Sequence, residues 1–396
     1  MRTGNWAPTG VPAIYRVINS LDTQVDSLKI VLSKKASIHS GYMLSTDRRL
    51  KLSGLRSKVD VLAGEEYFSS SLGSLRPKLS EVRQLFVILL IFWRFRPDVI
   101  YIDHANIWAA GVLARIASRP VILRLMGVYP AMRAALLGNR PAHMILRWCY
   151  RAPYSAVICT QDGSGVEPWL RSAISKNVPL HTLLNGVDAV GPSIKANTFR
   201  SLPSQRCVVM FLGKVEDAKG APEFVDAFLN ARSKTPGRFH ALIVGTGSRL
   251  DELKRRVREH SADEDFTFIE RLTHEEVSAA LARADIYVSL NRLGNLSNAN
   301  LEAMRAGCCM IIPSSQRDTS VDLITDEMIP DDAVFRIPSV DDIAALTRAL
   351  IDLSDQKAKR EVMGMTIKDI ADRVLMTWEQ RVTVETDLIQ SVAKTN

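Results

Sequence analysis

Residues 292–307 (RLGNLSNANLEAMRAG) join a helix start to a carboxylate one turn later, between two apolar strand-like runs. Ser297 or Asn298 can cap this helix, so its first amides, up to Ala299, are expected at the carboxyl end of a parallel strand. Free N–H groups and the positive end of the helix dipole favour an anion there. The spacing predicts a sugar-nucleotide site, with a diphosphate on the amides and a ribose on Glu302. The alternative is an ordinary βαβ unit with an exposed glutamate.

Two lysines follow another strand-like run, within the segment FLGKVEDAKG. Lys214 and Lys219 would both project from the carboxyl end of that strand. Two ammonium groups can neutralise a leaving diphosphate without a metal, which is the electrostatic work that a divalent cation does elsewhere. We therefore predict Lys214 and Lys219 as catalytic residues. The alternative is a pair of solvated loop lysines.

Two more residues are predicted to bind the donor from the same edge of the sheet. Gly245 lies in a Gly-Thr-Gly turn after one strand, and Arg271 follows the next strand, where it could frame a base. The acidic run 263–265 precedes its strand, so it is expected at the opposite edge as a solvated turn. We predict no metal site from it.

Polar residues also follow buried strands in the first half of the chain. His104, Asn106, Gly127 and Thr160 would lie at the carboxyl ends of three strands, where they could hold the donor sugar or the acceptor. For His104 the alternative is a hydrogen-bonded structural histidine.

Length and composition set broad bounds. The 396 residues are enough for two α/β domains, and 46% hydrophobic residues can build substantial cores. The five cysteines lack metal-ligand spacing, which favours reduced core residues in a cytosolic protein. Glycines and prolines near the start replace the apolar segment of a secretory signal. The longest apolar run, residues 85–93, is far shorter than the roughly 20 residues of a spanning helix.

The net charge of +8 is unevenly distributed. Residues 1–190 contain 24 Lys and Arg against 12 Asp and Glu, a net +12, whereas residues 191–396 contain 27 against 31, a net −4. The basic half predicts an anionic partner, either an anionic membrane surface or a phosphate-bearing acceptor, and no motif points to nucleic acid. Segments 85–93 and 131–151 could form a membrane-facing surface. We expect the first segment to pack on the sheet instead, and both alternatives stay open for the second.

Short apolar strands alternate with longer amphipathic stretches, which is typical of parallel α/β architecture. We predict an α/β fold of two Rossmann-like parallel-sheet domains that face each other across a cleft. Residues 1–189 would form the acceptor-side domain and residues 190–370 the nucleotide-sugar domain, with a helix in residues 371–396 crossing back to the first. The predicted strands are 28–33, 59–63, 99–103, 121–126, 156–160, 181–184, 207–212, 240–244, 266–270, 286–290, 310–313 and 334–337.

Five segments of the second half follow the order of a known family: FLGKVEDAKG, LIVGTGSRLDEL, FTFIERLTHEEV, ADIYVSL and LSNANLEAMRAG. Over residues 98–385 the chain resembles the retaining glycosyltransferases of family 4, which have the GT-B fold. The resemblance implies that Lys214 and Lys219 contact the diphosphate, that amides of residues 297–299 cradle it, and that Glu302 binds the ribose. Such enzymes need no essential metal, and the leaving phosphate assists the incoming hydroxyl.

Three positions depart from the family. Gly294 stands where the family has a glutamate that touches the sugar, so either another donor-binding group, Arg292 or Asn295, takes over or transfer is weak. Met126 replaces a histidine that reaches the sugar. The family also opens with a strand leading into a glycine-rich loop, but only nine residues precede Gly10, our candidate for that loop on the sugar side. An empty central strand position would leave backbone groups unpaired, so either the chain start is incomplete or another segment fills the position.

We therefore expect a cytosolic glycosyltransferase, peripheral at the inner face of a membrane. It would move a sugar from a UDP- or GDP-sugar to a glycan or lipid-linked acceptor, without cofactor or metal, in cell-surface polysaccharide or glycolipid synthesis. The alternatives are another GT-B activity, such as a sugar-nucleotide epimerase or a phosphorylase, and a non-catalytic sugar-nucleotide-binding protein.

Overall fold

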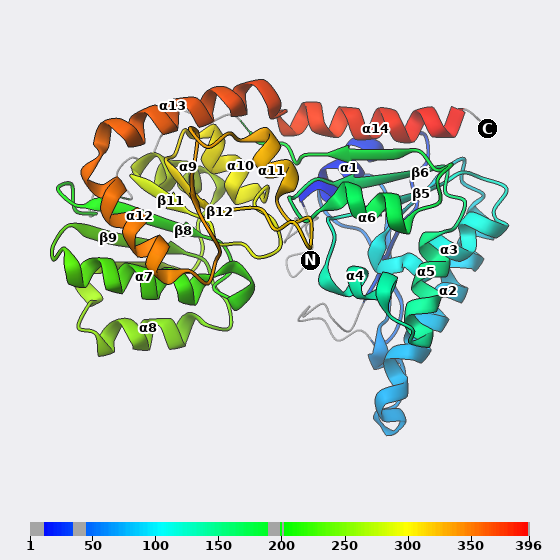
Figure 1. The fold of residues 1–396 in the computed structure, drawn as a ribbon. Coiled ribbons are helices and arrows are strands. Elements are labelled where there is room, and N and C mark those ends of the chain that lie inside the picture. Colours follow the sequence, from blue (N-terminus) through cyan, green and yellow to red (C-terminus); the bar gives the residue numbers. More distant parts are fainter. Residues whose placement is uncertain (1–11, 35–44, 189–198, 200–201, 395–396) are drawn as a thin grey trace. The chain divides into compact units, whose positions relative to one another are not determined.

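The structure is a computed structural model that describes residues 12–34, 45–188, 199 and 202–394 (Figure 1). The chain divides into two compact units. The first unit comprises Met1–Thr160, Glu167–Leu183 and Glu379–Asn396, and the second comprises Gln161–Val166 and Leu184–Trp378. The division thus falls before residue 184 rather than after residue 189, and the short segment 161–166 packs with the second unit.

The second unit contains a six-stranded parallel sheet in the order β10-β9-β8-β11-β12-β13. The four inner strands β9, β8, β11 and β12 are apolar runs that are buried along almost their whole length, as helices on both sides of a sheet require, whereas the edge strands β10 and β13 are partly buried. The strands are β8 (Cys207–Leu212), β9 (Phe239–Val244), β10 (Phe266–Ile269), β11 (Ile286–Val288), β12 (Met310–Pro313) and β13 (Phe335–Ile337).

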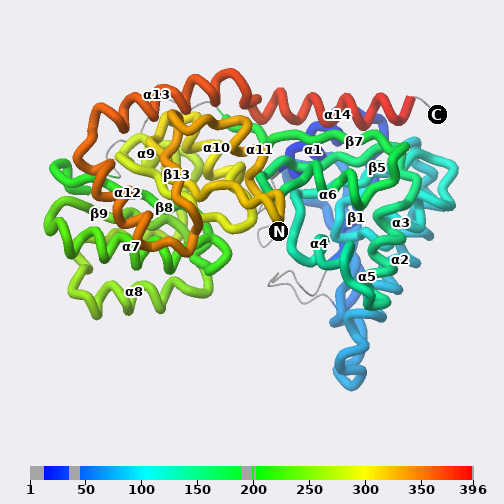
Figure 2. The backbone as a smooth tube through the Cα atoms, viewed as in Figure 1, coloured from blue at the N-terminus to red at the C-terminus, as the bar shows by residue number. Residues whose placement is uncertain are grey.

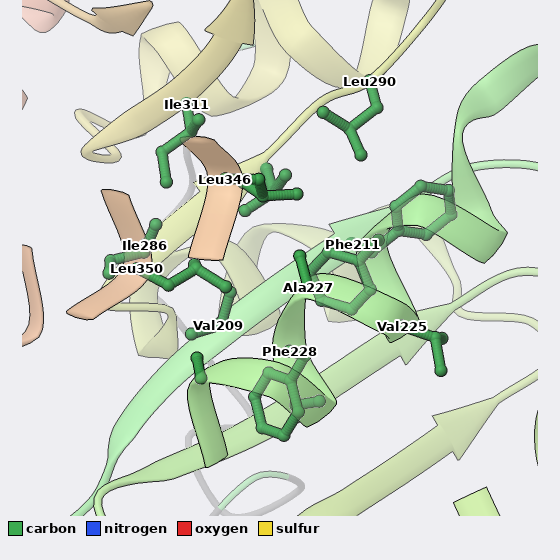
Figure 3. Close-up of a cluster of buried hydrophobic side chains, with 14 of the residues drawn as sticks. Val209, Phe211, Val225, Ala227, Phe228, Ile286, Leu290, Ile311, Leu346 and Leu350 are labelled. Atoms are coloured by element: carbon green, nitrogen blue, oxygen red, sulfur yellow. The ribbon is translucent and has the colours of Figure 1, made fainter. Parts of the chain in front are cut away.

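Alternate residues of β8 enter different cores. Val209 and Phe211 join the cluster under α7, α8 and α12 (Figure 3), whereas Val208 and Met210 join the cluster under α9, α10 and α13. Helices α7 and α12 lie side by side (Figure 2). The helices of this unit are α7 (Ala221–Lys234), α8 (Leu250–Glu259), α9 (His274–Arg283), α10 (Asn298–Arg305), α11 (Leu323–Met328), α12 (Ile343–Asp355) and α13 (Lys357–Val374).

The first unit contains a parallel sheet in the order β4-β5-β6-β7 and a separate sheet, β1-β3-β2, in which β2 is antiparallel. Within the described residues no strand joins the two sheets. The strands are β1 (Ile30–Ser33), β2 (Arg48–Leu50), β3 (Val59–Leu62), β4 (Ile100–Asp103), β5 (Val121–Leu125), β6 (Ala156–Thr160) and β7 (Leu180–Leu183). The helices are α1 (Pro12–Gln24), α2 (Arg76–Phe95), α3 (Ile107–Ile116), α4 (Pro130–Leu137), α5 (Pro141–Tyr150), α6 (Val166–Ala173) and α14 (Trp378–Lys394).

The α/β fold and all twelve predicted strands are confirmed, with strand ends that differ by at most two residues. The strand β2 was not predicted. The strand that the family resemblance places before Gly10 falls on residues 1–11, which lie outside the described residues.

Helix α2 packs with its polar side inward. Its buried residues are Ser80 and Gln84, and the Gln84 side-chain amide donates to the backbone oxygens of Lys34 (2.8 Å) and Ala63 (2.9 Å). In the segment 85–93, Phe86, Leu90 and Trp93 are exposed and the other six residues are partly buried. The prediction that this segment packs therefore holds for one face of the helix only. None of the helices in the described part of the chain is long and apolar enough to cross a membrane.

A buried ionic group attaches α14 to the sheet of the first unit. Glu385 of α14 accepts from Arg124 Nε of β5 at 2.7 Å and from Arg381 Nη1 at 2.7 Å, and the hydroxyl of Tyr101 in β4 donates to the same carboxylate. Burial alone would raise the pKa of Glu385, but the charges of Arg124 and Arg381 outweigh it and hold that pKa below its ordinary value.

We expect Glu385→Ala to lower the free energy of unfolding by about 3–5 kcal/mol, because two buried guanidinium groups lose their counter-charge. Urea denaturation would measure the loss. Glu379→Ala, at an exposed position of the same helix, is the control and should stay within about 0.5 kcal/mol of the original protein. Equal effects of the two substitutions would contradict a supporting role for the buried group.

Candidate functional site

A cavity of about 190 Å³ lies at the carboxyl end of the sheet of the second unit. Its walls are residues 211–213 at the carboxyl end of β8, residues 288–291 at the carboxyl end of β11, residues 297–300 at the start of α10, and Lys219. Because β8 and β11 are parallel neighbours, the loops that follow them meet at this edge.

The first turn of α10 lines this cavity, and the side chain of its N-cap residue does not cap the free amides of that turn. Ser297 has the extended backbone of an N-cap (φ −70°, ψ 159°), but its hydroxyl makes no capping hydrogen bond. The first intrahelical bond runs from the Leu301 amide to the Ser297 oxygen at 2.9 Å. The amides of Asn298 and Ala299 precede that bond, so they have no acceptor within the helix. This arrangement suits an anion.

Lys219 lines the cavity from the turn Asp217–Lys219, whereas the Lys214 side chain is 72% exposed and lies 3.9 Å from Glu216. Burial lowers the pKa of Lys219, the carboxylate of Asp162 opposes this effect, and the charge of Lys214 adds to it. The two lysines are therefore close enough to influence each other. Lys219 faces the cavity, and Lys214 is a solvated neighbour.

Glu302 lies one turn into α10, outside the cavity wall, in a small titratable cluster. Its carboxylate is 3.8 Å from Nδ1 of His274, and Nε2 of the same ring is 3.6 Å from Asp188. Burial raises the pKa of Glu302, the His274 imidazole opposes this rise, and the Asp188 carboxylate adds to it. The position of His274 beside Glu302 was not predicted from the sequence. His274 begins α9, which places it at the same edge of the sheet as the start of α10.

Asn295, predicted as a donor-binding residue, is part of a buried network and does not line the cavity. It is fully buried, and its side-chain amide donates to Asp322 Oδ2 (2.7 Å) while its oxygen accepts from Ser289 (2.8 Å). Asn300 donates to Ser289 (2.9 Å) and accepts from the hydroxyl of Tyr287 (2.9 Å). The amide groups of Asn295 are thus already satisfied by the protein.

Arg292, also predicted as a donor-binding residue, pairs with groups of the protein. Its guanidinium pairs with Glu223 (2.6 Å) and Asp341 (2.6 Å), and its backbone amide donates to the Ala218 oxygen at 3.1 Å. The hydrogen bond to Asp341 raises the pKa of Arg292. These bonds fix the turn that presents Lys219.

The other two residues predicted to bind the donor, Gly245 and Arg271, follow neighbouring strands of the sheet. Gly245 follows β9, and a Cβ there would lie 1.7 Å from the oxygen of Gly213, so this glycine permits close approach of two loops at the sheet edge. Arg271 is exposed after β10, two strands from β8. The acidic run 263–265 precedes β10 as predicted, and Asp265 pairs with Arg206 at 2.5 Å.

Gly294 makes room for another backbone segment. A Cβ at Gly294 would lie 2.4 Å from the oxygen of Asp162 and 2.6 Å from the amide nitrogen of Ser164, at a φ of +131°. The Leu296 amide donates to the same Asp162 oxygen at 3.1 Å. No side chain fits where the family resemblance implied a carboxylate.

Among the charged groups around Lys219, the Asp162 carboxylate has the largest effect on the pKa of Lys219. Its Oδ1 accepts from the Ser164 amide at 3.0 Å. Burial raises the pKa of Asp162 to about 6, although its hydrogen bonds to Ser164 and the charge of Lys219 oppose the rise. Asp162 follows the strand that ends at Thr160, so its place after a strand was visible in the sequence, but its approach to Lys219 was not.

In the first unit, the side chains of two predicted site residues form hydrogen bonds with other side chains of the protein. Nε2 of His104 is 2.8 Å from the hydroxyl of Tyr150, and burial lowers the pKa of His104 to about 4, which fits the alternative of a structural histidine. Thr160, predicted as an acceptor or sugar contact, is buried and accepts from Arg124 at 2.8 Å.

Asn106 donates to Asp103 at 3.3 Å, and Gly127 is buried directly after β5 at a φ of +107°. His104, Asn106, Gly127 and Thr160 all lie at the carboxyl ends of β4, β5 and β6, as predicted. Gly10 lies outside the described residues.

Residues 195–369 match the family model of group 1 glycosyl transferases. The matched region lies within the second unit and contains Lys219 and α10. A curated relative, the glycogen synthase of Mycobacterium tuberculosis, is 24% identical over 225 residues, which are 55% of this chain and 52% of the relative. The chain therefore spans about half the length of the curated relatives it matches.

Two solved structures share the fold. Sucrose-phosphate synthase from Thermosynechococcus elongatus aligns with a TM-score of 0.72 and 13% identity, over 98% of this chain and 95% of that one. HepE from Anabaena, in complex with UDP, aligns with a TM-score of 0.65 and 13% identity, over 92% of this chain and all of that one (100%). The fold is that of GT-B glycosyltransferases.

We expect Gly294→Ala and Gly294→Glu to destabilise the second unit by about 2–5 kcal/mol, because a side chain meets the backbone of Asp162 at a strained φ. Gly237→Ala is a matched control, since Gly237 also has a positive φ (+75°) but nothing within 4 Å of its Cβ. It should cost about 1 kcal/mol. Thermal unfolding measures all three variants, and a stable Gly294→Glu protein would show that the family glutamate fits here after all.

Proposed function

We propose that the protein is a retaining glycosyltransferase that moves a sugar from a UDP- or GDP-sugar to a glycan or lipid-linked acceptor and needs no metal. The observation that carries the proposal is the cavity where Lys219 meets the uncapped first turn of α10, inside the region that matches group 1 glycosyl transferases.

In this proposal the donor diphosphate lies on the amides of residues 297–299, with Lys219 beside it and Lys214 nearby. The bond between the anomeric carbon and the diphosphate oxygen breaks, and negative charge grows on the leaving group. The amides and ammonium groups stabilise that charge in a partly enclosed site. The acceptor oxygen bonds to the anomeric carbon on the same face, and its proton passes to the leaving phosphate.

A UDP-sugar is the first donor to test. HepE from Anabaena has been solved with UDP and with UDP-glucose, and it shares the fold of this chain. The curated relatives are glycogen synthases, which supports a glycan acceptor and a role in polysaccharide or glycolipid synthesis. The net charge of +12 in residues 1–190 supports an anionic acceptor and a peripheral position at the inner face of a membrane.

A non-catalytic sugar-nucleotide-binding protein is the second candidate, because Gly294 offers no carboxylate to the sugar. Asp162 favours catalysis, since it supplies a carboxylate whose charge acts on the pKa of Lys219. Turnover separates the two: an enzyme consumes the donor by transfer or hydrolysis, whereas a binder is stabilised by the nucleotide in a thermal-shift screen and leaves the sugar attached.

We expect Lys219→Ala to slow transfer by at least about 100-fold and to weaken UDP more than uridine, because the ammonium group meets charge on the diphosphate. Steady-state kinetics and calorimetry with both ligands measure the effect. Lys254→Ala, a lysine on α8 that pairs with Glu270, is the control and should change neither value. Equal losses for uridine and UDP would remove Lys219 from the diphosphate site.

We expect Glu302→Gln to weaken nucleotide binding by about 1–3 kcal/mol, since the ribose loses a charged acceptor. The same variant should be more stable at about pH 8, because burial raises the pKa of Glu302 and the ionised form therefore costs stability once the pH exceeds that pKa. The stability difference should shrink at about pH 4, where the carboxyl group is protonated. Unchanged UDP and GDP affinity in calorimetry would exclude Glu302 as a ribose ligand.

A further inference from the structure

Helix α2 of the first unit carries a continuous apolar stripe on its exposed side. Its six side chains, the first from the N-cap residue and the others from the helix, recur every three or four residues and are between 38% and 74% exposed: Leu75, Leu79, Val82, Phe86, Leu90 and Trp93. At 100° per residue they fall within an arc of roughly 80°, and they extend over about 27 Å of helix. The buried residues Ser80 and Gln84 lie on the opposite side, so the stripe faces away from the protein.

Basic residues border this stripe. Lys78 and Arg94 are exposed on its two sides, and Arg96 is exposed at the end of the helix. The segment 76–151, which runs from α2 through α5, contains 12 Lys and Arg against 3 Asp and Glu, a net +9. The net charge of this single segment therefore exceeds the net charge of the whole chain, which is +8.

A second set of exposed apolar side chains lies on α5 in the same segment. Met144, Ile145 and Trp148 are exposed at helical spacing, and the guanidinium of Arg115 on α3 stacks on Trp148 at 3.7 Å. Helix α3 packs against both α2 and α5, so the two apolar sets belong to adjoining helices.

We propose that the exposed stripe of α2 is a docking surface for an anionic lipid bilayer. The helix would lie in the plane of the interface, with Phe86, Leu90 and Trp93 among the lipid chains and Lys78 and Arg94 at the headgroups. Contiguous apolar surface of this kind on a folded protein marks an interaction site. Binding to lipid does not depend on sugar transfer, since the stripe and the cavity belong to different units.

The net positive charge of the segment 76–151 favours an anionic bilayer, rather than a second copy of the chain, as the partner of this surface. Two copies that met through this face would bring together two segments of net +9, and like charges oppose such contact. An anionic bilayer offers both the apolar phase and the opposite charge. A helix that lies in the interface also needs no spanning length, and α2 has 20 residues with basic groups at both ends.

Flotation with vesicles tests the proposal on the full-length protein. We expect binding to vesicles of mixed phosphatidylcholine and phosphatidylglycerol, and much weaker binding to pure phosphatidylcholine. Joint replacement Phe86→Ser, Leu90→Ser and Trp93→Ser should weaken binding at least about tenfold, because the apolar surface is lost. Joint replacement Lys78→Gln and Arg94→Gln should reduce the preference for the anionic vesicles and its sensitivity to salt.

Val362→Ser with Met365→Ser is the matched control, since both side chains are more than half exposed on α13 in the second unit. It should bind vesicles like the original protein. Circular dichroism and thermal unfolding should show that every variant remains folded. The proposal is wrong if the original protein binds neither vesicle type, or if the triple variant binds as well as the original. It is also wrong if light scattering shows a dimer that the triple variant dissociates, because the stripe would then hold a second copy.

Discussion

The carboxylate of Asp322 fixes the start of α10, and the candidate site depends on that bond. It accepts from both the backbone amide (2.6 Å) and the side-chain amide (2.7 Å) of Asn295, and from the hydroxyl of Thr325 at 2.7 Å. The amide of Asp322 donates to the oxygen of Gly163 at 2.7 Å. Burial raises the pKa of Asp322, and the hydrogen bonds from Asn295 and Thr325 oppose that rise. These bonds hold the loop before α10 in place, and the first turn of α10 lines the cavity without a capping hydrogen bond from the Ser297 side chain.

Strand positions were readable from the sequence because each strand is an apolar run between turn residues, and because the carboxyl ends of parallel strands share one edge. That rule was enough to bring Lys219 to the helix that begins after Ser297. The missed strand β2 is three residues long with two arginines, and it pairs only at a sheet edge, where apolar patterning is weak. The orientation of α2 was missed for a different reason. An apolar run predicts a helix face but not what covers it, and the partners of Gln84 lie 21 and 50 residues away.

Site residues were harder to predict where a polar side chain serves the protein rather than a ligand. Asn295, Arg292 and Thr160 have suitable side chains at suitable strand ends, but each is satisfied by a partner distant in sequence. Gly294 is the converse case. Its lack of a side chain looked like the loss of a functional group, whereas the structure shows that the backbone of Asp162 occupies that space. Neither outcome follows from local pattern, because both depend on which distant loop arrives at the position.

The excess positive charge lies in a different part of the chain from the candidate donor site. A nucleotide diphosphate would be held in the second unit, which belongs to the half of the chain with a net charge of −4, so its attraction must come from local amides and Lys219 rather than from the overall field. The excess positive charge is concentrated in residues 76–151, within the first unit. A protein that used its charge only to attract the donor would carry it around the cavity. That segment also contains the exposed apolar stripe of α2, so the charge that the proposed lipid contact would use belongs to a different unit from the cavity.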